Sequence, residues 1–280
     1  MREIAVELIT ELVARLCRET NIFLGQDIVA ALKKGYEFEE SSVGRECLRG
    51  ALDNAEIART ESMAICQDTG MTVVFIDYGQ EVVTSGGDFL TAINEGVRRG
   101  YREGYFRGSV VRDPLDRINT GDNTPAIVHT RIVPGDKLKI TVAPKGFGSE
   151  NMSRLAMLSP AQGLQGVKGF IVETVSLAGA NPCPPVVVGV GIGGTMEMAA
   201  LLAKRALLRD VGTMNLDPVL ADLELELLSE INKLGIGPQG LGGRCTALAV
   251  HLITYPTHIA GLPVAVNLSC HVTRHQTGII

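Results

Sequence analysis

Tryptophan is absent from this chain of 280 residues, and aromatic residues make up only 4% of it. Acidic residues outnumber basic ones by 31 to 26, which gives a formal net charge of −5 and argues against electrostatic binding of nucleic acid. There is no apolar run of about eighteen residues, so the sequence predicts no membrane span. The segment Met1–Ala5 is soon followed by acids and offers no small-residue cleavage site. We therefore expect no signal peptide and a cytoplasmic location.

The chain also lacks any CxxC pair, which excludes a zinc ribbon and a ferredoxin-type cluster motif. Its six cysteines are Cys17, Cys47, Cys66, Cys183, Cys245 and Cys270. In a cytosolic chain of this size disulfides are not expected. The roles that remain for these widely spaced cysteines are metal ligation, catalysis or simple burial. What the chain has in quantity is apolar residues, 45% of the total, and 32 glycines. That composition supplies a substantial core and many tight turns.

Apolar periodicity predicts a mixed α/β fold, in one catalytic domain over 1–280, with a mostly helical part at 1–61 and mixed sheets flanked by helices over 62–280. The predicted helices are 4–18, 27–34, 44–60, 87–105, 160–177, 195–209 and 218–234. The predicted strands are 72–76, 126–133, 137–143, 186–190 and 264–268. The second and third of these strands flank Pro134-Gly135-Asp136, a turn sequence that predicts a β-hairpin.

Gly189-x-Gly191-x-x-Gly194 matches the dinucleotide-binding fingerprint. That fingerprint requires a βαβ unit with an acidic residue at the end of the next strand. Here the predicted helix 195–209 is followed by a loop and a second helix, so Asp210 and Asp217 have no strand end to occupy. A nicotinamide-dependent oxidoreductase therefore stays as an alternative only. A glycine turn that leads into a helix also suits a carboxylate or a phosphate.

Three of the cysteines share a setting. Cys66 opens a polar loop, Cys183 lies between prolines in Asn181–Pro185, and Cys270 ends a predicted strand. Proline fixes φ and restricts the residue before it, so the loop around Cys183 is stiff. Three thiolates that converge would fit an iron–sulfur cluster with one iron left open, although spacing alone does not establish convergence. The alternative is that each cysteine is a small buried residue.

Four ordered motifs now carry a resemblance that covers nearly the whole chain. They are ICQDTG at 65–70, GFGSENMS at 146–153, NPCPP at 181–185 and GLPVAVNLSCH at 261–271. Together they resemble the class I, iron–sulfur-dependent fumarate hydratases, and equally the α subunit of L-tartrate dehydratase, which belongs to the same family.

The resemblance implies a [4Fe–4S] cluster bound by Cys66, Cys183 and Cys270, with a fourth iron free to bind substrate. It implies substrate binding by Gln67, Arg107 and Gly148, and catalytic roles for Asp68 and His258. Cys17, Cys47 and Cys245 match no ligand motif.

The implied reaction is the hydration of fumarate to (S)-malate, a step of the tricarboxylic acid cycle, with the open iron as a Lewis acid. Dehydration of L-tartrate is the alternative. Single-chain family members continue into a second domain, whereas this chain stops at Ile280. We therefore expect the α subunit of a heteromer, such as a dimer of α–β pairs, whose site a β subunit completes. A third hypothesis is a non-catalytic assembly subunit with merely buried cysteines.

Overall fold

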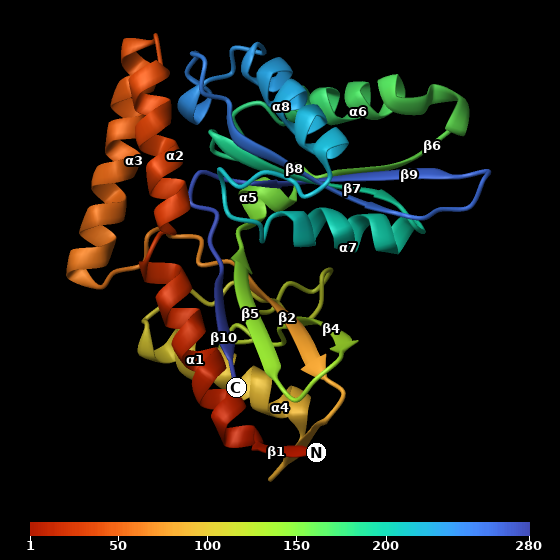
Figure 1. Ribbon diagram of the computed structural model, residues 1–280. Helices are drawn as coiled ribbons and strands as arrows, with labels where there is room; N and C mark the ends of the chain where they lie inside the picture. Colours follow the sequence, from red (N-terminus) through yellow and green to blue (C-terminus); the bar gives the residue numbers. More distant parts are fainter. The chain divides into compact units, whose positions relative to one another are not determined.

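The computed structural model describes residues 1–280, which divide into two compact units. The first unit comprises Met1–Gly25, Ala55–Phe147 and Arg274–Ile280, and the second comprises Gln26–Asn54 and Gly148–Thr273. Helices and mixed sheets alternate along the chain, which confirms the predicted mixed α/β fold (Figure 1). The single catalytic domain over 1–280 stays a prediction. No helix is long and apolar enough to cross a membrane.

The first unit is built on a four-stranded sheet with the order β10-β5-β2-β4. Its strands are β2 (Met71–Gly79), β4 (Ile127–Val133), β5 (Leu138–Lys145) and β10 (Gln276–Ile279). A parallel pair, β1 (Arg2–Ala5) with β3 (Val82–Ser85), and the helices α1 (Val6–Ile22) and α4 (Phe89–Glu103) complete it. The helix predicted from residue 4 therefore begins at residue 6, because residues 2–5 pair with β3 instead.

The core of the first unit depends on a close approach between α1 and α4. A Cβ atom on Gly96 would lie 2.7 Å from the Thr10 carbonyl oxygen, and one on Gly100 would lie 2.7 Å from the Cys17 Cβ. Only glycine permits that contact. Cys17 is buried there among apolar side chains, and burial raises the pKa of its thiol to about 12. Cys17 is therefore a packing residue, in keeping with its lack of a ligand motif.

The predicted hairpin over 126–143 is wrong. Both strands form, as β4 and β5, but β2 lies between them, parallel to β4 and antiparallel to β5. The turn around Gly135 passes over the end of β2, where the Glu81 N–H donates to the Gly135 carbonyl at 3.0 Å. The turn residues correctly indicated two strands that follow each other in the sequence. However, these strands do not pair with each other, because the apolar strand β2, which is distant in sequence, pairs with both.

The second unit contains a four-stranded sheet with the order β6-β9-β7-β8. Its strands are β6 (Arg154–Leu158), β7 (Val186–Gly193), β8 (Ala247–Tyr255) and β9 (Leu262–Ser269). Its main helices are α2 (Gln26–Phe38), α6 (Gly163–Ala178), α7 (Met196–Ala206) and α8 (Pro218–Asn232), with short turns α5 (Phe147–Glu150), η1 (Pro160–Gln162) and η2 (Pro238–Gly240). The remaining helix, α3 (Ser42–Glu61), runs from the second unit into the first.

Figure 1 shows α6 and α8 on one face of this sheet and α7 on the other. The glycines of the dinucleotide-like fingerprint allow the α7 packing. A Cβ atom on Gly189 would lie 2.2 Å from the Ala203 carbonyl oxygen, and one on Gly191 would lie 2.1 Å from that of Ala199. The chain then continues into α8 rather than into a strand. This glycine pattern therefore serves helix–sheet packing.

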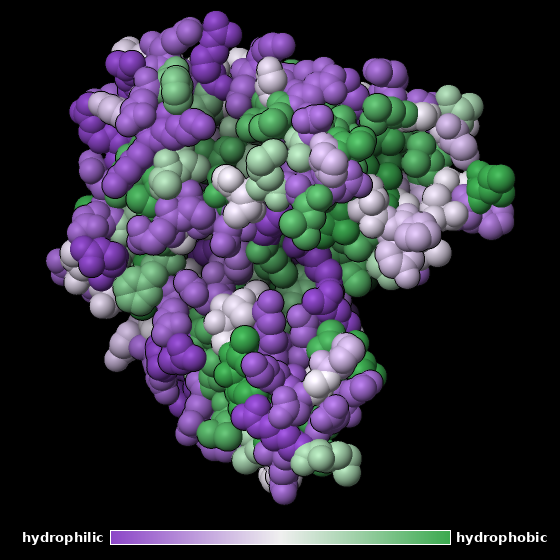
Figure 2. Space-filling model, in the orientation of Figure 1, coloured by the Kyte–Doolittle hydropathy of each residue, from purple (hydrophilic) through white to green (hydrophobic).

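The outer surface of the second unit carries several exposed apolar side chains. Leu164 and Leu177 on α6 are 55% and 64% exposed, and Leu225 on α8 is 60% exposed. Figure 2 shows apolar residues gathered over this region beside polar ones.

Candidate functional site

In the second unit, strand pairing brings Cys183 and Cys270 to the same end of the sheet. β7 and β9 are antiparallel, and Val187 near the start of β7 pairs with Ser269 at the end of β9. The loop just before β7, which contains Cys183, must therefore lie beside Cys270, the residue after β9. Accordingly, the His271 N–H donates to the Cys183 carbonyl at 3.3 Å, and the His271 Nδ1 lies 3.0 Å from the same oxygen.

The loop around Cys183 has an unusual backbone. Cys183 has a φ of +54°, in the left-handed region that side-chain-bearing residues rarely adopt. Its N–H donates to the Ala180 carbonyl at 3.0 Å, and its side chain is exposed. Cys270 is half-buried and directly follows β9. The strained, anchored backbone fixes the position of an accessible thiol.

Gln239 connects the two cysteine loops, and the sequence analysis missed it. Its N–H and its Nε2 both donate to the Pro184 carbonyl, at 2.8 and 3.0 Å, and its Nε2 lies 3.2 Å from the His271 Nδ1. Like Cys183, Gln239 has a φ of +54°. The glycine-dense loop 235–243 was visible in the sequence, but nothing there singled out the one amide side chain within it.

The motif that begins at Gly146 also reaches this end of the second sheet. Gly148 is exposed in α5, and Ser153, just before β6, accepts the Leu268 N–H on its Oγ at 3.1 Å. Glu150 pairs with Lys204 and accepts the Asn267 Nδ2 at 3.0 Å. Three of the four recognised motifs therefore place residues at one end of one sheet.

In the first unit, antiparallel strand pairing likewise brings together the residues around Asp68. Met71 at the start of β2 pairs with Lys145 at the end of β5, so the loop before β2 meets the loop after β5. The Asp68 carboxylate accepts the Phe147 N–H at 2.8 Å and the Gly70 N–H at 3.0 Å. Two backbone donors therefore fix the orientation of this carboxylate.

Side chains from three distant segments fix the main chain of the same loop. The Arg274 Nη2 donates to the Asp68 carbonyl at 2.7 Å, the Tyr101 hydroxyl to the Thr69 carbonyl at 2.6 Å, and the Asn123 Nδ2 to the Gly70 carbonyl at 3.1 Å. Burial raises the pKa of Tyr101, so its hydroxyl remains a donor. None of these three contacts was foreseen from the sequence.

Gln67, within this loop, and Arg107, beside it, have exposed side chains. The Thr69 Oγ1 donates to the Arg107 carbonyl at 3.0 Å, which ties the Arg107 main chain to the loop. The guanidinium itself is exposed and makes no ion pair, and the Gln67 side chain is exposed as well. Cys66 is half-buried at the start of the loop. Cys66, Gln67, Asp68 and Arg107 are therefore neighbours within the first unit.

His258 lies elsewhere. It is exposed in the loop between β8 and β9, at the end of the second sheet opposite Cys270. The eight residues of β9 separate the two, which corresponds to on the order of 25 Å of strand. Within this unit, the structure does not bring His258 to Cys183 and Cys270.

Within neither unit do three Cys, His, Asp or Glu side chains come close enough together to hold a metal ion. Cys66 belongs to the first unit, whereas Cys183 and Cys270 belong to the second. Burial raises the pKa of Cys245 to about 12, so this thiol stays protonated near neutral pH. Cys183 is exposed, whereas Cys66 and Cys270 are half-buried, as Cys47 and Cys245 are.

Comparison with known proteins defines the class. The family model described as "Fumarate hydratase (Fumerase)" matches residues 10–279. The chain is 42% identical over 272 residues to a Methanocaldococcus jannaschii protein named "Putative L(+)-tartrate dehydratase subunit alpha", a match that covers 95% of each chain. It is 33% identical over 280 residues to the "L(+)-tartrate dehydratase subunit alpha" of Escherichia coli (strain K12), covering 99% of this chain and 92% of the other. The same figures hold for the protein of that name from Shigella sonnei.

These matches span almost the full chain at more than 30% identity. The chain therefore belongs to the class I fumarate hydratase and L(+)-tartrate dehydratase α family, a family of hydro-lyases.

Proposed function

We propose that this chain is the α subunit of a hydro-lyase and that the thiolates of Cys66, Cys183 and Cys270 hold a [4Fe–4S] cluster. The observation that carries the proposal is that Cys183 and Cys270 lie at the same end of one sheet, where the N–H of His271, next to Cys270, donates to the Cys183 carbonyl. Thiolates are the usual ligands of iron–sulfur clusters, and both side chains reach the surface at least in part. The donor set therefore fits the group.

Chain connectivity supports the addition of Cys66 to this pair. Asp68, two residues after Cys66, accepts a hydrogen bond from the N–H of Phe147. Phe147 is the last residue of the first unit in this stretch, and Gly148, the next residue, begins the second. The loop that carries Cys66 is thus bonded to the covalent junction that leads into the motif at 146–153.

Arg107 and Gln67 are proposed to bind the substrate. The exposed Arg107 guanidinium offers the planar fork that a carboxylate accepts in bidentate fashion. Gly148 is proposed to supply a main-chain contact, since it brings no side chain to obstruct a ligand. When bound, the cluster supplies a Lewis-acidic iron for hydroxyl and carboxylate oxygens. Arg107 would in turn stabilise negative charge that develops on the substrate carboxylate.

Asp68 is proposed to handle the proton. Dehydration removes a proton from the carbon beside one carboxylate while hydroxide leaves the next carbon, and hydration reverses both events. An oriented carboxylate suits that role, and the two backbone donors hold Asp68 in one position. His258 is the second candidate; its placement at the far end of the second sheet makes Asp68 the first to test.

Two C4 dicarboxylate substrates are proposed, fumarate in exchange with (S)-malate, and L(+)-tartrate. The family description supports the first, and the names of the relatives support the second. Those names include "subunit alpha", which supports a β subunit that completes the site, in an assembly such as a dimer of α–β pairs.

The test is a side-by-side assay of the two reactions. The chain is produced with its partner subunit, reconstituted with iron and sulfide without oxygen, and supplied with fumarate or L(+)-tartrate at equal concentrations. The substrate with the larger kcat/KM is assigned, and Arg107→Ala should lower that ratio for both. Turnover of neither substrate by a fully iron-loaded assembly would overturn the proposed reaction.

A further inference from the structure

The outer side of β8 in the second unit takes no part in the proposed hydro-lyase site. β8 pairs with β7 on one side only, so its other side is a free sheet edge. In a parallel pair, the N–H and C=O of alternate residues point away from the neighbouring strand. Such an edge normally requires protection, because it can pair with another chain.

Side chains protect both ends of this edge. The Asn232 amide caps Ala247, with its Oδ1 2.8 Å from the Ala247 N–H nitrogen and its Nδ2 3.3 Å from the carbonyl oxygen. At the other end, Glu224 accepts the Leu252 N–H at 2.7 Å, and the Asn215 Nδ2 donates to the Leu252 carbonyl at 3.0 Å. Each cap reproduces the donor and acceptor of an adjacent strand.

Val250 lies between the two caps and has none. Because Leu252 directs its N–H and C=O outward, strand alternation directs those of Val250 outward as well. No side chain caps it as Asn232 and Glu224 cap its neighbours. The edge is therefore open only in the middle, over the segment Leu248–Val250.

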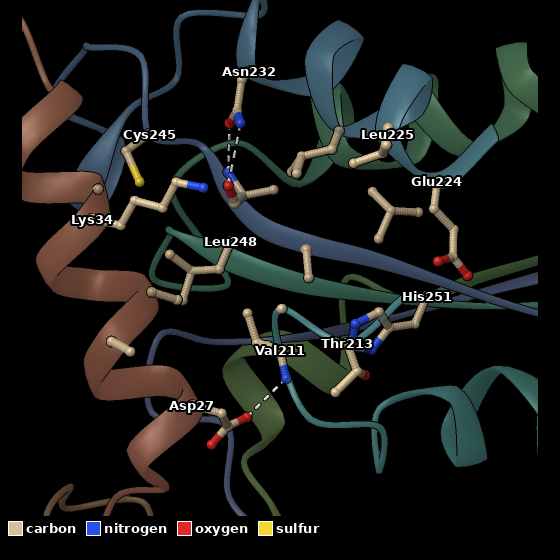
Figure 3. Close-up of a pocket in the computed structure, with 18 of the residues that line it drawn as sticks. Asp27, Lys34, Val211, Thr213, Glu224, Leu225, Asn232, Cys245, Leu248 and His251 are labelled. Carbon is tan, nitrogen blue, oxygen red and sulfur yellow. Dashed lines mark hydrogen bonds between the residues drawn. The ribbon is translucent and has the colours of Figure 1, made fainter. Parts of the chain in front are cut away.

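This open segment forms the floor of a cavity of about 580 Å³, here termed the β8 groove. One wall is the face of α2 that carries Ala30 and Ala31, and the other is the face of α8 that carries Leu225 and Leu228. Figure 3 shows these elements on either side of β8. The small alanines leave open the space that larger side chains would fill.

Lys34 gives the groove a charged end. Figure 3 shows its side chain extending from α2 into the groove, near Cys245 and Leu248 at the start of β8. Lys34 lines the groove and makes no ion pair. Three carboxylates line the groove, and each is engaged: Glu224 with Arg209, Asp27 with the Val211 N–H, and Glu39 with the N–H groups of Arg244 and Cys245. Lys34 has no such partner, so an anionic group that entered at this end would meet its ammonium.

We propose that the β8 groove binds the C-terminal end of an extended segment from another chain, which pairs with Val250 and places its carboxylate at Lys34. A strand that runs antiparallel to β8 brings its C-terminus to the start of β8, where Lys34 lies. Ile280 is not the occupant, because its main chain is paired with that of Leu138 beside β5. The ligand class is therefore a carboxylate-terminated peptide with side chains that fit apolar walls.

The test uses the full chain and an array of randomised pentapeptides attached through their N-termini, with either free carboxylate or amide C-termini. The wild-type chain should bind a subset of the free-acid peptides, and amidation should weaken that binding about 2- to 5-fold, the scale of an exposed ion pair. Lys34→Met should remove the difference between acid and amide. Ala31→Phe, which fills the groove from an exposed helix, should abolish binding while circular dichroism stays unchanged.

Methylation of the peptide nitrogens supplies the register. Along the best-bound peptide, methylation one nitrogen at a time should weaken binding more than tenfold at one position, the nitrogen that donates to the Val250 carbonyl, because the outward groups of Ala247 and Leu252 are already capped. Equal binding of the array by the wild-type chain and Ala31→Phe would overturn the proposal. Binding that ignores the positions of the methyl groups would replace strand pairing with simple apolar association.

Discussion

Gln239 offers a direct perturbation of the loop geometry on which the proposed cluster site depends. Gln239→Ala removes the two side-chain contacts of the amide, to the Pro184 carbonyl at 3.0 Å and to the His271 Nδ1 at 3.2 Å. The His271 Nδ1 either accepts from the Gln239 Nε2 or donates to the Cys183 carbonyl, so the variant removes one or two hydrogen bonds. At about 0.5–1.5 kcal/mol each, the loops lose roughly 0.5–3 kcal/mol of ordering. If cluster binding must restore that order, iron affinity should fall about 2- to 150-fold.

The assay is competition for iron between the reconstituted assembly and a chelator at equilibrium, without oxygen. Gln239→Gly tests the loss of the side-chain contacts without added backbone strain. Glycine adopts the left-handed φ of +54° without strain and keeps the N–H that donates to the Pro184 carbonyl. It should weaken iron binding as Gln239→Ala does. Gln165→Ala, at an exposed glutamine of α6, is the matched control and should have no effect. Wild-type iron affinity in both Gln239 variants would refute the reasoning.

Three further predictions concern stability and substrate binding. Burial alone would raise the pKa of Glu39, but the N–H groups of Ser41, Cys245 and Arg244 outweigh it and hold the pKa below its usual value. Glu39 therefore stabilises the fold at pH values above its unfolded pKa, and this stabilisation is lost as pH falls through the lower folded pKa. In urea unfolding, Glu39→Ala should lower the free energy of unfolding by about 2–4 kcal/mol at pH 7 and by less at pH 4. Gly191→Ala should lower Tm sharply or prevent folding, since the new Cβ would lie 2.1 Å from a carbonyl oxygen, whereas Gly169→Ala, with nothing within 4 Å, should raise stability by about 0.5–1 kcal/mol. Arg107→Lys should raise KM about tenfold with little change in iron content, because an ammonium cannot replace a bidentate fork, and an unchanged KM would remove Arg107 from the substrate site.

The sequence predicted most elements of the fold because their signals are local. The helices at 44–60 and 218–234 and the strand at 186–190 appear within a few residues of the expected bounds, as α3, α8 and β7. Apolar periodicity and a capping residue such as Asp217 determine these elements within a single stretch of chain. The pairing of β4 and β5 was mispredicted because it depends on β2, a strand about fifty residues away whose competition no local pattern reveals.

Apart from what the family resemblance implied, the sequence predicted only those residues of the candidate site that lie beside the ends of predicted strands. Cys183 and Cys270 were recognised as residues beside strands, and antiparallel pairing of those strands brings them together. Tyr101, Arg274 and Gln239 were missed because each acts through long-range hydrogen bonds to loop carbonyls. Such contacts leave no periodic or compositional signal, so a structure is needed to find them.

The most direct test of the central claim is the amount of iron and acid-labile sulfide bound per chain, measured on the assembly with its partner after reconstitution without oxygen. We expect about four of each per chain, as a [4Fe–4S] cluster requires. Cys66→Ser, Cys183→Ser and Cys270→Ser should each lose most of both, whereas Cys47→Ser, at a half-buried helical cysteine, should retain them. Full iron and sulfide content in any of the three ligand variants, or none in the wild-type assembly, would contradict the account.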